Sequence, residues 1–150
     1  MSYINSALLP NEHLILKAKI HWIIYVSALI ILGIGLILCF RGGGSGLEVI
    51  GFILSVIGIA KLLKAWLYCY STELAITSMR IIAKYGLIRR NTIELKHDKM
   101  ESLNVDQGIL GRILNYGSVS VIGTGGSRAP IPYIANPLLF KKKALEISEK

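Results

Sequence analysis

The feature that most constrains this chain is an uncharged apolar run from Trp22 to Phe40, WIIYVSALIILGIGLILCF. As an α-helix a run of this length rises about 28 Å, which matches the hydrocarbon thickness of a bilayer. A secretory signal peptide has a shorter apolar core behind a basic start, whereas this run lies well inside the chain and ends in Leu-Cys-Phe-Arg. We therefore expect a first transmembrane helix at about residues 22–40.

A second apolar run extends from Leu47 to Leu67 and is interrupted by three charges. Glu48 falls at its start, while Lys61 and Lys64 are three residues apart on one helical face near its other end, where long side chains reach the headgroups. Trp66, Tyr68 and Tyr70 are aromatic residues of the kind found at membrane interfaces. We expect a second transmembrane helix at about residues 47–67.

The turn between these runs, Arg41–Gly46, is too short and too rich in glycine to fold by itself, so the two helices should be antiparallel neighbours. Lys17 and Lys19 precede the first span, and Lys61, Lys64 and Arg80 end or follow the second, whereas the turn contains only Arg41. Because basic flanks face the cytoplasm, we expect both termini there. We therefore expect a multi-pass membrane protein with a transmembrane hairpin at residues 22–70.

Glycines in both runs allow more than one kind of packing. Gly33 and Gly35 in the first run, and Gly51 and Gly58 in the second, would let helix backbones approach closely, either within the hairpin or between protomers. Glycine facing lipid is an equally good interpretation, because membrane helices tolerate it. The sequence leaves these alternatives open.

No residue pattern indicates catalysis, a cofactor or a metal. Cys39 and Cys69 would lie near opposite faces of a hydrocarbon layer about 30 Å thick, so they cannot form a disulfide within one chain. The three histidines are scattered and lack the spaced partners of a zinc site. Thr124–Ser127 is glycine-rich but is not followed by the lysine of a phosphate-binding loop. We expect no catalytic, cofactor-binding or metal-ligating residues, and no enzyme.

The segment after Tyr70 has the periodicity of a soluble domain. Over the whole chain 53% of residues are hydrophobic and only 17% are charged, which leaves more apolar surface than one soluble domain needs. After Tyr70, however, apolar and polar residues alternate with period two, as in half-buried β-strands. The alternating stretches are 73–77, 92–96, 102–106 and 118–121. We expect an antiparallel meander of about six or seven strands.

Two short helical patterns accompany these strands. Within residues 107–116 the spacing of four apolar residues predicts a short amphipathic turn of helix. Asn136 is a favoured N-cap and Pro137 suits a first helical position, so a helix should occupy 137–149. Its buried face should carry Phe140, Ala144 and Ile147.

Several short motifs cover nearly the whole chain. They are Leu9–Glu12, His21-Trp22, Glu73–Ile82, Gly86–Arg90, Ile93–Leu95, Asp98–Ser102, Val105–Gly108, Gly111–Leu114, Tyr116-Gly117 and Gly123–Gly126. With these motifs and this order of elements, the chain resembles the bacterial pleckstrin-homology-like (PH-like) domains, of the membrane-flanked type in which two transmembrane helices precede the domain. The basic loop with which eukaryotic relatives hold phosphoinositides is nearly absent, so that specificity is not carried over.

The resemblance implies a split barrel of about seven strands plugged at one end by the C-terminal helix. It also implies an interaction or assembly role at the bacterial cytoplasmic membrane. The expected fold is therefore an α+β membrane protein with three parts: an N-terminal cytoplasmic segment at 1–21, the hairpin at 22–70, and a PH-like domain at 71–150.

The charge of the chain favours lipid as a partner. Its formal net charge is +8, and a basic domain tethered beside a bilayer has anionic phosphates within reach. Nucleic acid would attract the same charge, but no nucleic-acid-binding motif is present, so we expect none as a partner. The candidate membrane-surface contacts are Lys61, Lys64, Arg80, Arg89, Arg90 and Arg112.

The role of Arg89-Arg90 has two interpretations. Consecutive strand residues point to opposite faces, so at most one of the two reaches a given surface. They either protect a strand edge by their charge or orient the domain on anionic lipid. The sequence does not choose between them.

The leading functional hypothesis is a non-enzymatic, membrane-anchored scaffold or protein-interaction module, with a protein partner or self-association into a homo-oligomer. One alternative is a domain that senses anionic lipid or a small ligand. Another is an accessory subunit of a transport or resistance complex, because two apolar spans are too few to form a pore.

Overall fold

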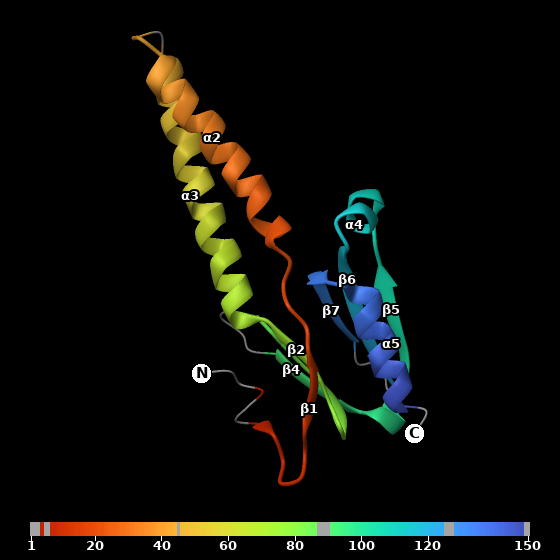
Figure 1. The fold of residues 1–150 in the computed structure, drawn as a ribbon. Helices are drawn as coiled ribbons and strands as arrows, with labels where there is room; N and C mark the ends of the chain where they lie inside the picture. Colours follow the sequence, from red (N-terminus) through yellow and green to blue (C-terminus); the bar gives the residue numbers. More distant parts are fainter. Residues whose placement is uncertain (1–3, 5–6, 45, 87–90, 125–127, 149–150) are drawn as a thin grey trace. The chain divides into compact units, whose positions relative to one another are not determined.

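The computed structural model describes residue 4 and residues 7–44, 46–86, 91–124 and 128–148. The chain divides into two compact units. One unit, the helical hairpin, is Trp22–Cys69. The other, which we call the β domain, combines Met1–His21 with Tyr70–Lys150 (Figure 1). The hairpin is therefore an insertion within the sequence of the β domain.

The hairpin consists of a short 3-10 helix, η1 (Trp22–Tyr25), and two α-helices, α2 (Val26–Arg41) and α3 (Leu47–Ser71). Trp22–Arg41 and Leu47–Ser71 are each long and apolar enough to cross a membrane. Most of their large apolar side chains are exposed, among them Ile37 at 57% and Phe52 at 66%. The helices thus begin where the two apolar runs predicted them, and α3 continues four residues beyond the expected end of the second span.

Small residues form the contact between α2 and α3. A Cβ atom built on Gly35 would lie 2.6 Å from the backbone nitrogen of Ser55, and one on Gly51 would lie 2.6 Å from that of Cys39. A Cβ atom built on Gly58 would lie 2.8 Å from the Cα atom of Leu32. These glycines therefore serve close approach within the hairpin, whereas a Cβ on Gly33 would meet no atom within 4 Å.

Replacing Gly51 by alanine should force the two helices apart. The added methyl group would meet backbone atoms of α2, which cannot rotate away, and overpacking of this kind costs about 1–3 kcal/mol. Spin labels at the exposed positions Leu36 and Ile50, one on each helix, would report a longer distance in Gly51→Ala. Gly33→Ala is the matched control, because it has open space and should leave that distance unchanged. An unchanged distance in Gly51→Ala would contradict the observed packing.

The β domain is built on two antiparallel sheets, with strand orders β1-β2-β3-β4 and β5-β6-β7. The four stretches of alternating residues lie in β2, β4, β5 and β6, which confirms the period-two prediction. The strands are β1 (Leu14–Lys17), β2 (Glu73–Thr77), β3 (Arg80–Tyr85), β4 (Asn91–Lys96), β5 (Met100–Asp106), β6 (Tyr116–Gly123) and β7 (Arg128–Ala135). The helical elements are η2 (His97–Lys99), α4 (Ile109–Ile113) and α5 (Pro137–Ser148).

The N-terminal segment belongs to the β domain, which corrects the expected separate segment at 1–21. Leu16 is paired with Ile76 across the ladder between β1 and β2. The chain then continues past β1 to β7, where Ile20 bridges Ile134 and the Ala135 N–H donates to the Lys19 carbonyl at 2.8 Å. One extended segment therefore joins the two sheets, and its pairing partners follow the hairpin in sequence.

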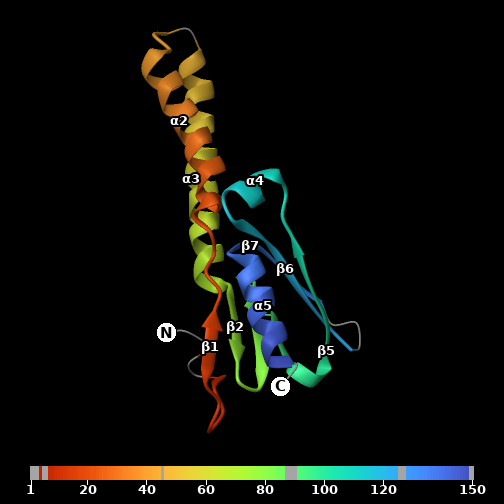
Figure 2. The same cartoon turned by 45° about the vertical axis from the view of Figure 1, so that its right-hand side comes forward.

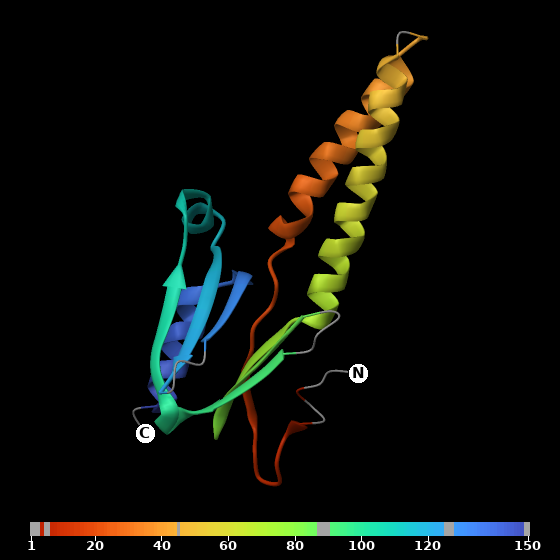
Figure 3. The same cartoon turned by 180° about the vertical axis from the view of Figure 1, so that it is seen from behind.

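The expected split barrel is present only in part, because the two sheets do not form a closed barrel. On one side the N-terminal segment joins them, and on the other the chain passes from β4 through η2 into β5 (Figure 3). Among the described residues, no ladder pairs β4 with β5. The architecture is thus two antiparallel sheets of four and three strands.

The core lies between the sheets and α5, which runs along the β5-β6-β7 sheet (Figure 2). Phe140 and Ala144 are buried and Ile147 packs against the same cluster, which confirms the predicted inner face of the C-terminal helix. The buried cluster comprises Leu74, Ile76, Ile81, Ala83, Leu103, Val119, Val121, Ile131, Ile134, Phe140 and Ala144.

Candidate functional site

A buried ion pair ties the N-terminal segment to β3. The Glu12 side chain is completely buried, and its Oε2 lies 3.0 Å from Nη2 of Arg80. Nε of Arg80 donates to the other carboxylate oxygen at 3.0 Å, which makes the contact bidentate. The Thr77 hydroxyl lies 2.6 Å from the same oxygen and the Leu9 N–H donates to Oε2 at 2.8 Å. The carboxylate is therefore fully occupied by donors.

Other N–H groups of the Arg80 guanidinium also have acceptors. Nη1 donates to Oε2 of Glu94 on β4 at 2.6 Å, and Nη2 donates to the Ala7 carbonyl at 2.7 Å. The Arg80 side chain is 15% exposed. This setting differs from the membrane-surface contact expected for Arg80, because its charge is shared between two carboxylates inside the domain.

The electrostatics of Glu12 favour its charged form. Burial by itself would raise the pKa of the Glu12 carboxyl above the ordinary value of 4.5. Hydrogen bonds from Thr77, the Leu9 N–H and Arg80, together with the charge of Arg80, outweigh burial and lower the pKa. A carboxylate held ionised and surrounded by donors suits a structural ion pair rather than proton transfer.

The other predicted surface cations are dispersed. Lys61 and Lys64 are exposed on α3 of the hairpin, whereas Arg112 is exposed on α4 of the β domain. Arg89 and Arg90 lie outside the described residues, so their two interpretations remain predictions. The described cations therefore belong to different units of the chain.

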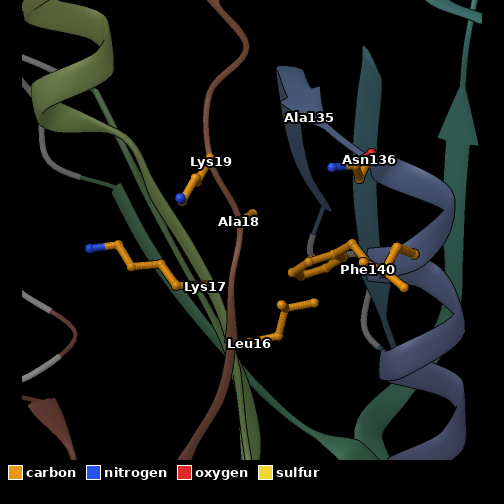
Figure 4. A pocket seen from close by; sticks show the side chains of 8 residues that line it. Leu16, Lys17, Ala18, Lys19, Ala135, Asn136 and Phe140 are labelled. Carbon is orange, nitrogen blue, oxygen red and sulfur yellow. The ribbon is translucent and has the colours of Figure 1, made fainter. Parts of the chain in front are cut away.

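A groove of about 240 Å³ lies between the N-terminal segment and α5. Leu16 and Ala18 face Phe140 across it, while the side chains of Lys17 and Lys19 point to the opposite side of the segment (Figure 4). The groove is smaller than typical ligand pockets, which enclose about 300–1,000 Å³, and it lacks converging charged groups. Its geometry does not support a small-molecule site.

Metal-binding side chains do not gather in the part of the chain that the structure describes. No three His, Cys, Asp or Glu residues among these positions are placed to hold an ion. Cys39 and Cys69 are both free thiols within the hairpin.

A family model and a solved structure are similar to this chain. The model of the family described as "Bacterial PH domain" matches residues 17–147. A solved structure of a DUF1696 family protein with a pleckstrin-homology domain, from Shewanella loihica PV-4, is 7% identical, with a TM-score of 0.47, covering 97% of this chain and 89% of that one. No functionally curated protein matches the chain. Because the family model matches from the last residue of β1 into α5, including the inserted hairpin, the chain belongs to the bacterial PH domain family.

Proposed function

We propose that this protein is a non-enzymatic interaction module that its helical hairpin anchors in the bacterial cytoplasmic membrane. PH-like domains commonly mediate contacts with proteins or lipids, and the family match assigns the β domain to that class. The observation that carries the proposal is the exposure of large apolar side chains along both hairpin helices. Water would disfavour such a surface, whereas lipid accommodates it.

The proposed topology places the β domain and both termini on the cytoplasmic side. Lys17 and Lys19 precede the first span, Lys61 and Lys64 lie near the end of the second, and Arg41 is the one basic residue of the turn. This asymmetry follows the positive-inside rule. The module then works by holding a protein partner, or a second copy of itself, at the inner leaflet.

Alkaline carbonate washing tests the anchoring. The full-length chain should remain in the membrane pellet, because two spans do not dissociate when peripheral contacts are disrupted. A matched variant, in which a Gly/Ser linker of about ten residues replaces residues 22–69, should appear in the soluble fraction. Release of the full-length chain would refute the anchor. Mass measurement of the intact assembly from native membranes would then identify a partner or a homo-oligomer.

A further inference from the structure

The short helix α4 presents large apolar side chains to solvent. Ile109 is 82% exposed, Ile113 is 72% exposed and Leu110 is 63% exposed. In a helix these three positions lie within about 100° of one another, so they share one face. We call them the α4 tip. The spacing in the sequence predicted this helical turn, but an apolar face on such a turn would ordinarily pack inward.

The outward orientation of the α4 tip is fixed by its contacts with the domain. Gly111 is buried on the other side of the helix, where a Cβ atom would lie only 2.6 Å from the Tyr116 carbonyl oxygen. The Gln107 side-chain amide donates to the carbonyls of Gly111 and Tyr116, at 3.2 and 3.0 Å. Glycine therefore seats the helix against β6, and a rotation that buried the α4 tip would bring larger side chains against this backbone.

The α4 tip lies at the same end of the β domain as His21, the last residue of the N-terminal segment. The His21 ring stacks on the Tyr116 ring with centroids 5.2 Å apart, and Trp22 is the next residue in the chain. Tyr116 follows Ile113 by three residues, a separation of at most about 11 Å. The His21 N–H also donates to the Tyr133 carbonyl at 2.6 Å, which fixes this end of the N-terminal segment.

These observations favour a bilayer over a protein as the partner that covers the α4 tip. A standard protein interface buries about 800 Å² on each partner, far more than three side chains on one short helix supply. Shallow insertion needs much less, because a tethered domain is already at high effective concentration beside the lipid. Arg112 is exposed on the same helix, and its charge suits anionic headgroups, with Asp106 the exposed acid at the end of β5.

We propose that the α4 tip inserts into the headgroup region of the bilayer that the hairpin spans, with Arg112 contacting anionic lipid phosphates. This inference rests on the proposed anchoring. It gives the β domain a second membrane attachment beyond its covalent connections, and so a fixed orientation on the inner leaflet.

The test uses the full-length chain with Cys39 and Cys69 replaced by alanine, reconstituted in vesicles of three parts phosphatidylcholine to one part phosphatidylglycerol. An environment-sensitive fluorophore is attached in separate samples at Leu110→Cys, Lys99→Cys or Ile59→Cys. Position 99 is the matched control, because it is exposed and lies at the other end of β5, about 20 Å or more from α4. Position 59 is an exposed site in the middle of α3 and reports the anchor.

Brominated lipids should quench the label at position 110 about twofold or more beyond the label at position 99, with a blue-shifted emission. Ile109→Ser combined with Ile113→Ser should return the label at 110 to water-like emission, and both positions are exposed enough for the fold to tolerate the change. Vesicles of phosphatidylcholine alone should weaken the quenching.

Three other outcomes would contradict either the insertion of the α4 tip or the anchoring. Quenching at 59 without quenching at 110 would overturn the insertion of the α4 tip while leaving the anchor intact. Absence of quenching at 59 would refute the anchoring itself. A label at 110 that is shielded only at high protein density, and not quenched by brominated lipid, would show that a second copy covers the α4 tip and would overturn the proposal.

Discussion

Residues 71–150 expressed alone should fail to form a cooperatively folded domain. The fragment lacks β1 and the extended segment that joins the two sheets, so the β2 edge and the β7 edge both lose their partners. It also lacks Glu12, which leaves the partly buried guanidinium of Arg80 without one of its two carboxylates. Each of these losses costs several kcal/mol, a large part of the total stability of about 5–15 kcal/mol of a small domain. Dispersed amide signals in an NMR spectrum would report folding.

The matched comparison is a protein in which a Gly/Ser linker joins residues 1–21 to 70–150. The Ala18 N–H donates to the Leu74 carbonyl at 2.8 Å, so the two chain ends lie only a few residues from a shared hydrogen bond. A linker of about ten residues has a mean span of about 17 Å, enough to connect them. This linked protein should give a dispersed spectrum and unfold cooperatively. A well-folded 71–150 fragment would show instead that the N-terminal segment is dispensable.

Replacing Glu12 by glutamine should destabilise the β domain by about 3–5 kcal/mol, because it removes the more buried of the two carboxylates that neutralise the charge of Arg80 inside the domain. The uncharged amide also places an NH₂ group where one of the two carboxylate oxygens now accepts hydrogen bonds, either from Thr77 and Arg80 or from Leu9 and Arg80. Chemical denaturation of the linked β domain would measure the change. Glu94→Gln is the matched control, since Glu94 is 35% exposed and its ion pair is worth about 1 kcal/mol or less.

The same pair of variants gives a pH signature. Folding lowers the pKa of Glu12, so its contribution to stability is complete above the ordinary value of 4.5 and is lost as the pH falls through the lowered pKa. Glu12→Gln should flatten the acid limb of the stability curve, whereas Glu94→Gln should leave most of it. Equal acid limbs for wild type and Glu12→Gln would show that the ion pair is not the source of the pH dependence.

The short motif Leu9–Glu12 has one feature that the sequence reveals, its family resemblance, and one that only the structure reveals, the burial of Glu12. The motif was recognisable as part of the family resemblance, but nothing in its letters indicates that Glu12 is buried, because an acid in a polar segment is exposed in most proteins. Burial depends on Arg80 and Thr77, which follow the hairpin in sequence. For the same reason the sequence does not show that Arg80 is paired with Glu12 and Glu94.

Strand β1 was missed for a related reason. Its four residues, Leu14–Lys17, are too few to show alternation, and its partner β2 begins after both hairpin helices. Among the described residues the number of strands matches the prediction of about seven, but the predicted split barrel is present only as two separate sheets, because barrel formation depends on edges that meet only in three dimensions. The α4 tip was recognised as helical but not as exposed, since burial of Gly111 decides which face points outward.

By itself the sequence determined the two long apolar helices, the alternating strands and the C-terminal helix. These depend on composition and on periods of two and about 3.6 residues within one segment. Only the tertiary structure decided that the first 21 residues complete the β domain, that Glu12 and Arg80 form its buried ion pair, and that the α4 tip faces solvent. Each of these depends on contacts between residues far apart in the chain, which local patterns do not encode.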